Sequence, residues 1–328
     1  MQNRHKIGAP PKIVVIGGGT GLSVMLRGLK EKPMDITAIV TVADDGGSSG
    51  VLRNELQIPP PGDVRNVLMA LADTEPLLAE VLQYRFNSGT GLAGHSLGNL
   101  MLAAMADITG DFVTGVRELS RVLAVRGRVL PAAAQAIVLK AEMADGSIVI
   151  GESMIPKAGQ AIKRVFIDTE NAHALPEAVK AIEQADAILI GPGSLYTSIM
   201  PNLIVPMLAQ AITESCAVKL FVCNVMTQPG ETDNYTVSDH MNAIEAHIGL
   251  QLFDYVIVNN GEISPQVEAK YAEMGAKPVA IDLEAIRSKG CEIIADRFVL
   301  FQTFLRHDAE RLSHHIYKLV ENWIIRKR

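Results

Sequence analysis

The stretch Ile13-Val14-Val15-Ile16-Gly17-Gly18-Gly19-Thr20-Gly21 decides the predicted fold. Its first four residues are apolar and β-branched, which is typical of a buried parallel strand. An apolar run with helical spacing follows the glycines at residues 22–30. A strand, a glycine turn and a helix in this order bring free backbone N–H groups close to an anion. We therefore predict that the phosphates of a nucleotide-like ligand are bound by Gly17, Gly18, Gly19, Thr20 and Gly21.

The glycine stretch does not say which nucleotide binds. The dinucleotide fingerprint G-x-G-x-x-G requires a glycine where Leu22 stands, and the Gly-Lys-Ser/Thr of a Walker A loop is missing. The order of strand, glycine turn and helix, taken alone, leaves NAD as an alternative ligand. A tight turn that binds nothing is the other alternative, and it is disfavoured because three consecutive glycines cost backbone entropy.

Composition narrows the class of protein. The chain has 328 residues, 48% of them hydrophobic, which is enough for one large α/β domain. Its net charge of −6 argues against a nucleic-acid partner. An odd number of cysteines, three, fits a reducing compartment. Because no membrane span and no signal peptide are seen, we expect a cytoplasmic protein with a flexible tail at residues 1–11 and a single domain at residues 12–328.

Two carboxylates follow the second predicted strand, residues 36–42. Asp44 and Asp45 begin a loop at the carboxyl end of this strand, where ligands bind in doubly wound sheets. They suit either a ribose hydroxyl or Mg²⁺. The structural alternative is an Asx-type turn, in which the Asp side chains hold their own backbone. The same loop adds Gly46, Ser48 and Ser49 to the candidate nucleotide-binding residues.

Four further segments carry candidate ligand-binding residues. Asp63 suits the N-cap of a helix predicted over residues 64–72. The other segments are a second glycine-rich loop before an apolar helix, a glycine loop after a predicted strand at 187–190, and a polar loop after a predicted strand at 218–222. In chain order the candidates are Arg65 and Asn66; His95 and Asn99; Gly193 and Ser194; and Asn224, Thr227 and Gln228, the last three as readers of a base or sugar.

One region departs from the alternation of strands and helices. The Asp-Gly turn at residues 145–146 lies between two β-rich runs and predicts a hairpin. We therefore expect a small β-rich insertion over about residues 127–170, at the edge of the site. The strand–helix alternation then resumes, with residues 278–281 as the expected last sheet strand. The predicted fold is a Rossmann-like, doubly wound, mostly parallel α/β sheet with this insertion.

Five motifs in this order resemble the YvcK-like gluconeogenesis factors, a branch of the family that also contains the 2-phospho-L-lactate transferase CofD. They read Gly-Gly-Gly-Thr-Gly at 17–21, Asp-Asp-Gly-Gly-Ser-Ser-Gly at 44–50, Pro-Gly-Asp-Val-Arg-Asn at 61–66, His-Ser-Leu-Gly-Asn at 95–99 and Gly-Pro-Gly-Ser-Leu-Tyr-Thr-Ser at 191–198. The resemblance runs from about residue 12 to about residue 315. It implies a Rossmann-like fold, binding of UDP-sugars such as UDP-N-acetylglucosamine, and a role in cell shape and cell-wall precursor supply on gluconeogenic carbon sources.

The resemblance also implies individual roles. It places Tyr271 and Arg306 near the sugar nucleotide. The transferase branch moves a phospholactyl group from a guanosine diphosphate-type donor to a deazaflavin with Mg²⁺, and Asp44 and Asp45 match its metal-binding loop. Because the resemblance implies UDP-sugar binding and no nucleophile–base pair is recognisable, we expect a UDP-sugar-binding regulator without catalytic activity. A CofD-like transferase with Asp44, Asp45 and Asp63 around Mg²⁺ is the alternative. The expected partners are the sugar nucleotide, proteins of cell-wall or central metabolism, and further copies of the chain in a homo-oligomer.

Overall fold

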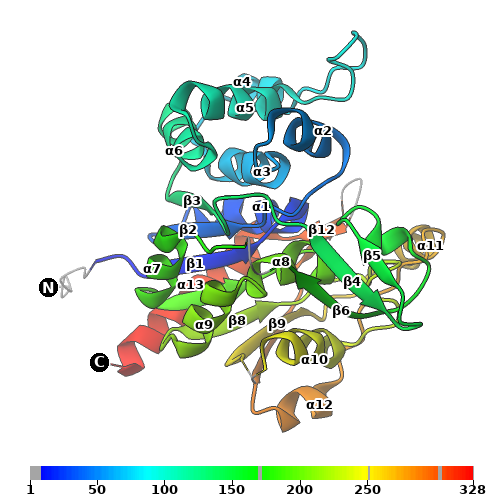
Figure 1. Ribbon diagram of the computed structural model, residues 1–328. Helices are drawn as coiled ribbons and strands as arrows, with labels where there is room; N and C mark the ends of the chain where they lie inside the picture. The colour runs from blue at the N-terminus through cyan, green and yellow to red at the C-terminus, as the bar shows by residue number, and fades with distance from the viewer. Residues whose placement is uncertain (1–8, 169–171, 250–251, 302–304, 328) are drawn as a thin grey trace, which may run out of the picture.

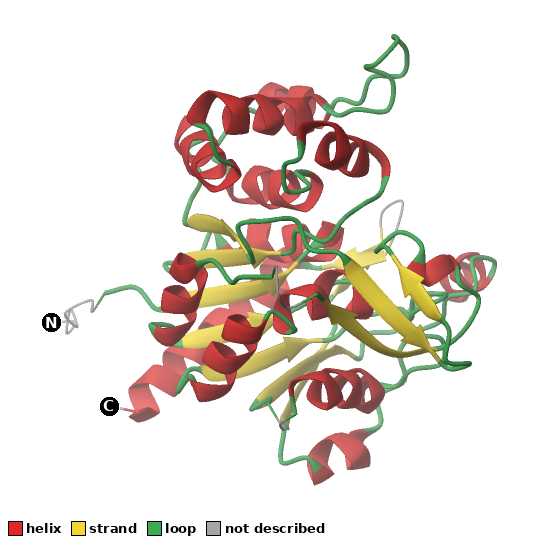
Figure 2. Cartoon of the chain, in the orientation of Figure 1, coloured by secondary structure: helices red, strands yellow, loops and turns green. Residues whose placement is uncertain are grey.

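The structure is a computed structural model that describes residues 9–168, 172–249, 252–301 and 305–327. At its centre lies a seven-stranded sheet in the order β10-β9-β8-β7-β1-β2-β3, and all neighbouring strands in it are parallel (Figure 2). The strands are β1 (Lys12–Gly17), β2 (Asp35–Val40), β3 (Arg128–Pro131), β7 (Ala187–Ile190), β8 (Val218–Val222), β9 (Tyr255–Asn259) and β10 (Glu292–Asp296). The predicted α/β fold is confirmed. Residues 1–8 of the predicted tail lie outside the described residues.

The strand order reverses direction between β1 and β7. From β1 the chain moves outward through β2 to β3, and from β7 it moves the opposite way through β8 and β9 to β10. Right-handed crossovers then place the connecting helices on opposite faces of the sheet. Helix α1 (Gly19–Leu29) packs against α13 (Ala309–Lys327), and α7 (Pro176–Glu183) packs against α9 (Pro206–Glu214) on the other face (Figure 1). Such a reversal opens a crevice at the carboxyl ends of the two strands.

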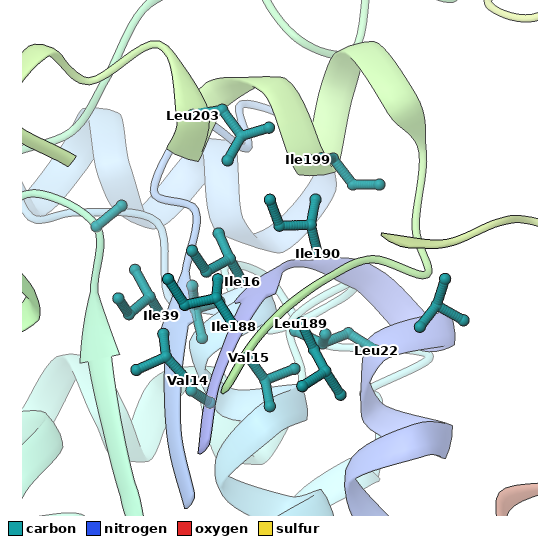
Figure 3. Packing of buried hydrophobic residues seen from close by; sticks show 14 of the residues in the cluster. Val14, Val15, Ile16, Leu22, Ile39, Ile188, Leu189, Ile190, Ile199 and Leu203 are labelled. Atoms are coloured by element: carbon teal, nitrogen blue, oxygen red, sulfur yellow. The ribbon is translucent and has the colours of Figure 1, made fainter. Parts of the chain in front are cut away.

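Strands β1 and β7 form the centre of the core. Val14, Val15 and Ile16 of β1 lie beside Ile188, Leu189 and Ile190 of β7, and all six are at most 2% exposed (Figure 3). Burial on both faces explains why β1 reads as a continuous apolar run and does not alternate. This packing fixes the point at which the glycine loop leaves the sheet.

A layer of helices lies between β2 and β3 in the sequence and covers the β2–β3 end of the molecule (Figure 1). It consists of α2 (Gly47–Leu56), α3 (Gly62–Leu71), α4 (Pro76–Gln83), α5 (Leu97–Thr109) and α6 (Phe112–Val122). Helix α3 also contacts α1. The layer thereby brings the start of α3 next to the glycine loop.

The β-rich insertion forms a separate antiparallel sheet of β4 (Leu139–Met143), β5 (Ile148–Ile150) and β6 (Ile162–Ile167). The predicted hairpin is therefore confirmed. The predicted start near residue 127 is wrong, because Arg128–Pro131 pairs in parallel with β2 as the edge of the main sheet. A short 3₁₀ helix, Ile155–Lys157, lies between β5 and β6.

The C-terminal third contains one wrong prediction. Residues 278–281 make only two isolated bridges, Met226 with Pro278 and Thr236 with Ala280, so they are not a sheet strand. The last strand of the main sheet is β10, which pairs with β9. The remaining elements are α8 (Met200–Leu203), α10 (Val237–Ile248), α11 (Pro265–Ala272), α12 (Leu283–Ser288), β11 (Val299–Phe301) and β12 (Leu305–His307). Strands β11 and β12 pair as an antiparallel ribbon.

Within the described part of the chain, no single helix has both the length and the apolar composition needed to cross a membrane. The segments Leu195–Leu203 and Pro206–Glu214 reach that composition only when taken together, and they are bent by 79° relative to each other.

Candidate ligand-binding site

A cavity of about 440 Å³ lies at the carboxyl ends of β1, β7 and β8. This is the crevice that the reversal of strand order opens, and the volume is typical of a small-molecule site. Ten of the predicted site residues line it: Gly19, Thr20, Gly21, Gly193, Ser194, Asn224, Thr227, Gln228, Tyr271 and Arg306. Twelve do not: Gly17, Gly18, Asp44, Asp45, Gly46, Ser48, Ser49, Asp63, Arg65, Asn66, His95 and Asn99. The structure thus divides the predicted site into a cavity and a neighbouring polar cluster.

The first turn of α1 forms one wall of the cavity. Its N–H groups have no partner inside the helix, because an α-helix leaves its first four N–H groups free. Gly19 has a left-handed φ of +72°, which favours glycine. A Cβ atom at Gly18 would lie 2.5 Å from Asp63 Oδ2 and 2.9 Å from Thr41 Cγ2. Both glycines are therefore required for the turn that exposes the N–H groups of Thr20 and Gly21 to the cavity.

The loop after β7 forms the opposite wall, and the polar residues after β8 hold it in place. Asn224 donates from Nδ2 to the carbonyl oxygen of Gly193 at 2.7 Å and accepts from the Gly193 N–H at 3.1 Å. Gln228 donates to Ser194 Oγ at 2.6 Å. Thr227 exchanges hydrogen bonds with the backbone of Lys277. Asn224 and Gln228 therefore position Gly193 and Ser194, and Thr227 holds the Lys277 loop. That these three side chains read a base or sugar stays a prediction.

Glu231 is a buried carboxylate that sequence reasoning missed. It accepts from the Tyr196 N–H at 3.1 Å and from Thr197 Oγ1 at 3.0 Å, at the start of the π-helical turn Leu195–Ile199. Burial raises the pKa of Glu231, and the hydrogen bonds from Thr197 and Tyr196 oppose that rise. Glu231 therefore fixes the turn that follows Ser194, and its partners could not be read from local sequence because they are more than thirty residues away.

The C-terminal wall joins two elements that are distant in the sequence. Tyr271 of α11 accepts at its hydroxyl from the Leu305 N–H at 2.9 Å, and this bond anchors β12 beside the cavity. Arg306 and His307 of β12 line the cavity. Burial lowers the pKa of His307 to about 4, so its imidazole is neutral near pH 7. Arg306 is thus the charged group that this wall contributes.

Asp63 lies behind the glycine loop. It was predicted as the N-cap of its helix, but α3 starts at Gly62 with Pro61 as its N-cap, and no side chain caps it. The Asp63 carboxylate accepts instead from the Gly19 N–H and from the Asn66 side chain. Burial, followed by the nearby charge of Asp44, raises the pKa of Asp63 to about 6. The structure therefore places a titratable group in contact with the turn that shapes the cavity.

We expect the Asp63→Asn variant to lose part of the pH dependence of folding. The raised pKa means that the protonated carboxyl is favoured in the folded state, so its stabilising contribution is complete below about pH 4 and is lost as the pH rises through about 6. The asparagine side chain keeps an acceptor oxygen without the charge. From about pH 4 to about pH 8, the free energy of unfolding of the variant should gain up to about 3 kcal/mol relative to the wild type. Urea unfolding at several pH values measures this change. A difference in the free energy of unfolding between variant and wild type that does not vary with pH would contradict the prediction.

Asp44 and Asp45 were predicted as alternatives for a ribose or a metal. Asp44 Oδ1 accepts from the Gly46 N–H at 2.9 Å, which is an Asx-type turn, and Asp45 Oδ1 accepts from the Ser153 N–H at 2.8 Å. Nearby Glu152 is largely protonated at neutral pH, because burial and then the charges of Asp44 and Asp45 raise its pKa to about 8. Among the described residues, no three His, Cys, Asp or Glu side chains are arranged to hold a metal ion.

The predicted residues of the helical layer form a hydrogen-bonded network away from the cavity. His95 Nδ1 lies 3.0 Å from Ser48 Oγ, and Asn99 Nδ2 donates to the same oxygen at 3.1 Å. All three side chains are at most 7% exposed. The network joins the start of α2 to the start of α5, while Arg65 of α3 packs against Gly98. These contacts hold the buried His95 side chain outside the cavity, and its predicted contact with a ligand stays a prediction.

Several residues that line the cavity were not predicted as site residues. Val24, Pro192, Ser198, Val225, Met226, Leu305 and His307 line the cavity but were not predicted. Val24 lies one turn beyond Thr20 on α1, so helical periodicity identifies it once Thr20 is placed in the site. Leu305 and His307 become visible only through the pairing of β12, which depends on tertiary structure.

The fold and this cavity define a Rossmann-like α/β protein with a cavity at its topological switch point. Residues 13–299 match the family described as 2-phospho-L-lactate transferase CofD. The chain belongs to this family.

Its relatives identify the branch. The chain is 55% identical over 316 residues to the gluconeogenesis factor of Bacillus subtilis, covering 96% of this chain and 100% of that protein. It is 58% identical to the gluconeogenesis factor of Halalkalibacterium halodurans, covering 93% and 95%. A crystal structure of a UPF0052 family member from Bacillus halodurans superimposes with a TM-score of 0.91 at 57% identity, covering 94% of this chain and 98% of that one. The predicted likeness to gluconeogenesis factors is thus confirmed.

Proposed function

We propose that the chain is a cytoplasmic regulatory protein that binds a UDP-sugar, such as UDP-N-acetylglucosamine, in the cavity at the switch point. Binding would couple the supply of cell-wall precursors and cell shape to growth on gluconeogenic carbon sources. The observation that carries the proposal is the cavity itself, whose lining includes both the first turn of α1, with its free N–H groups, and Arg306. These are groups that bind a diphosphate, and the relatives named gluconeogenesis factors support the link to gluconeogenic growth.

The position of the acidic residues favours a sugar nucleotide over NAD. A dinucleotide site places a carboxylate on the ribose at the end of the second strand. Asp44 and Asp45 follow β2, but neither lines the cavity, which extends from β1 toward β7 and β8. Leu22 also replaces the third glycine of the fingerprint and is fully buried.

A CofD-like transferase is the second candidate, and the family match favours it. Its reaction would need a metal at the diphosphate. None of the described residues that line the cavity is acidic, and Asp44 Oδ1 and Asp45 Oδ1 accept from the backbone of Gly46 and Ser153 outside the cavity. The Ser48–His95 pair is buried outside the cavity. We therefore place the regulator ahead of the transferase.

Calorimetric titration of the purified chain separates these functions. We expect UDP-N-acetylglucosamine to bind with micromolar affinity, equally well with and without Mg²⁺, and NAD and GDP to give no heat. Mg²⁺-dependent binding of GDP alone would overturn the regulator and support the transferase. Turnover of the UDP-sugar to a new product would also contradict the proposal.

A further inference from the structure

Arg306, which lines the cavity, and Arg27 of α1 have no acidic partner among the residues that the structure describes. Arg27 lies in the last turn of α1, and Arg306 lies on β12, which packs against α1. In the part of the chain that the structure describes, neither guanidinium forms an ion pair or a hydrogen bond with a carboxylate. Other described arginines outside the cavity, such as Arg117 and Arg311, do pair with acids.

Arg27 lies next along the face of α1 whose residues Thr20 and Val24 line the cavity; Arg27 itself is exposed and does not line it. Thr20, Val24 and Arg27 follow one another at spacings of four and three residues, which places them on one side of the helix. Thr20 and Val24 line the cavity. Side chains on a helix lean in general toward its N-terminus, which is the direction in which Val24 and the first turn lie from Arg27.

The two guanidiniums repel each other. Partial burial lowers the pKa of Arg27, and the charge of Arg306 lowers it further. No acidic group of the described chain offsets this effect on the pKa. Two like charges held together at a cavity mouth raise the free energy of the empty protein, and an anion placed between them removes that cost.

We propose that Arg27 acts together with Arg306 as a two-arginine clamp on the diphosphate of the bound sugar nucleotide. The inference rests on the proposed function and adds a residue and a mechanism to it. The clamp supplies the positive charge that a divalent metal provides in other diphosphate sites. Guanidinium groups suit this role, because each donates two parallel hydrogen bonds to phosphate oxygens. The first turn of α1 would hold the same diphosphate from the side of the glycine loop.

The test compares Arg27→Gln with the wild type by calorimetric titration of UDP-N-acetylglucosamine. We expect the affinity to fall about tenfold to hundredfold, as for the loss of a charged hydrogen bond. Arg27→Lys keeps the charge but cannot donate two parallel hydrogen bonds, so its affinity should lie between those of the wild type and Arg27→Gln. The matched control is Arg117→Gln, which removes an exposed arginine of α6 and should leave the affinity unchanged. An unchanged affinity of Arg27→Gln would overturn the proposal.

Two further measurements distinguish a clamp from a structural role. Without ligand, Arg27→Gln should melt no lower than the wild type, because it relieves the repulsion with Arg306. A lower melting temperature accompanied by unchanged affinity would show that Arg27 supports the fold and would overturn the clamp. Affinity for uridine, which has no phosphate, should be the same in both proteins, and a parallel loss for uridine would likewise contradict the clamp.

Pyrophosphate separates this inference from the proposed function. If the wild type binds no UDP-sugar, the proposed function fails. The clamp is then judged on inorganic pyrophosphate alone, which should bind the wild type more tightly than Arg27→Gln. Equal binding of pyrophosphate by the two proteins would overturn the clamp, whatever nucleotide the cavity accepts.

Discussion

Replacing Gly18 by alanine should lower the affinity for UDP-N-acetylglucosamine at least about hundredfold, the loss expected when the diphosphate loses its aligned N–H donors. The added Cβ atom would lie 2.5 Å from Asp63 Oδ2 and 2.9 Å from Thr41 Cγ2, and real Cβ atoms do not approach so closely. The Asp63 carboxylate is buried and accepts from the Gly19 N–H, so its displacement also moves the first turn of α1. Calorimetric titration measures the loss.

Gly46→Ala is the matched control for this substitution. Gly46 was predicted in the same site, but it lies outside the cavity, has a φ of −92° and leaves at least 3.4 Å around an added Cβ atom. The affinity of Gly46→Ala for UDP-N-acetylglucosamine should stay near that of the wild type. If Gly18→Ala bound normally and Gly46→Ala did not, the ligand would belong to the acidic loop and the cavity would not be the site.

Replacing Gly28 by alanine should destabilise the protein by about 3 kcal/mol, the cost of overfilling a packed contact, and lower its melting temperature by about 5 °C. An added Cβ atom would lie 2.0 Å from the carbonyl oxygen of Ala309, where α1 crosses the start of α13. That oxygen belongs to the backbone, so no side-chain rotation relieves the clash. Thermal unfolding followed by circular dichroism measures the change.

Helix propensity alone predicts that Gly28→Ala stabilises the protein, because alanine is more favourable than glycine inside a helix by about 1 kcal/mol. Gly21→Ala makes the same substitution in the same helix, where the nearest atom to an added Cβ is 3.4 Å away. We expect its melting temperature to equal or slightly exceed that of the wild type. A Gly28→Ala protein as stable as Gly21→Ala would show that α13 does not pack on α1 as described.

The parts of the fold with strong local signals were predictable. The run before Gly17 is apolar and β-branched because β1 is buried on both faces, and the glycines follow because the chain turns there into α1. Helix α2 had no such signal, since it starts with Gly-Ser-Ser-Gly, which is typical of turns. Strand β10, Glu292–Asp296, has charged residues at both ends, whereas the apolar residues 278–281 matched a strand pattern without having a strand to pair with.

The candidate site was predictable in composition but not in the roles of its residues. Polar residues at the ends of parallel strands indicate a ligand, and Asn224 and Gln228 do lie at the cavity. Their hydrogen bonds go to Gly193 and Ser194, a partner loop whose position only the tertiary structure reveals. Arg27 was missed for the same reason, because its charge becomes meaningful only when β12 brings Arg306 beside α1.

A crystal structure of the chain with UDP-N-acetylglucosamine tests the central claim most directly. The account predicts density for the diphosphate between the first turn of α1 and the guanidinium of Arg306, with no metal ion bridging the phosphates. Density for the nucleotide beside Asp44 and Asp45, or a metal ion held by those carboxylates, would contradict it.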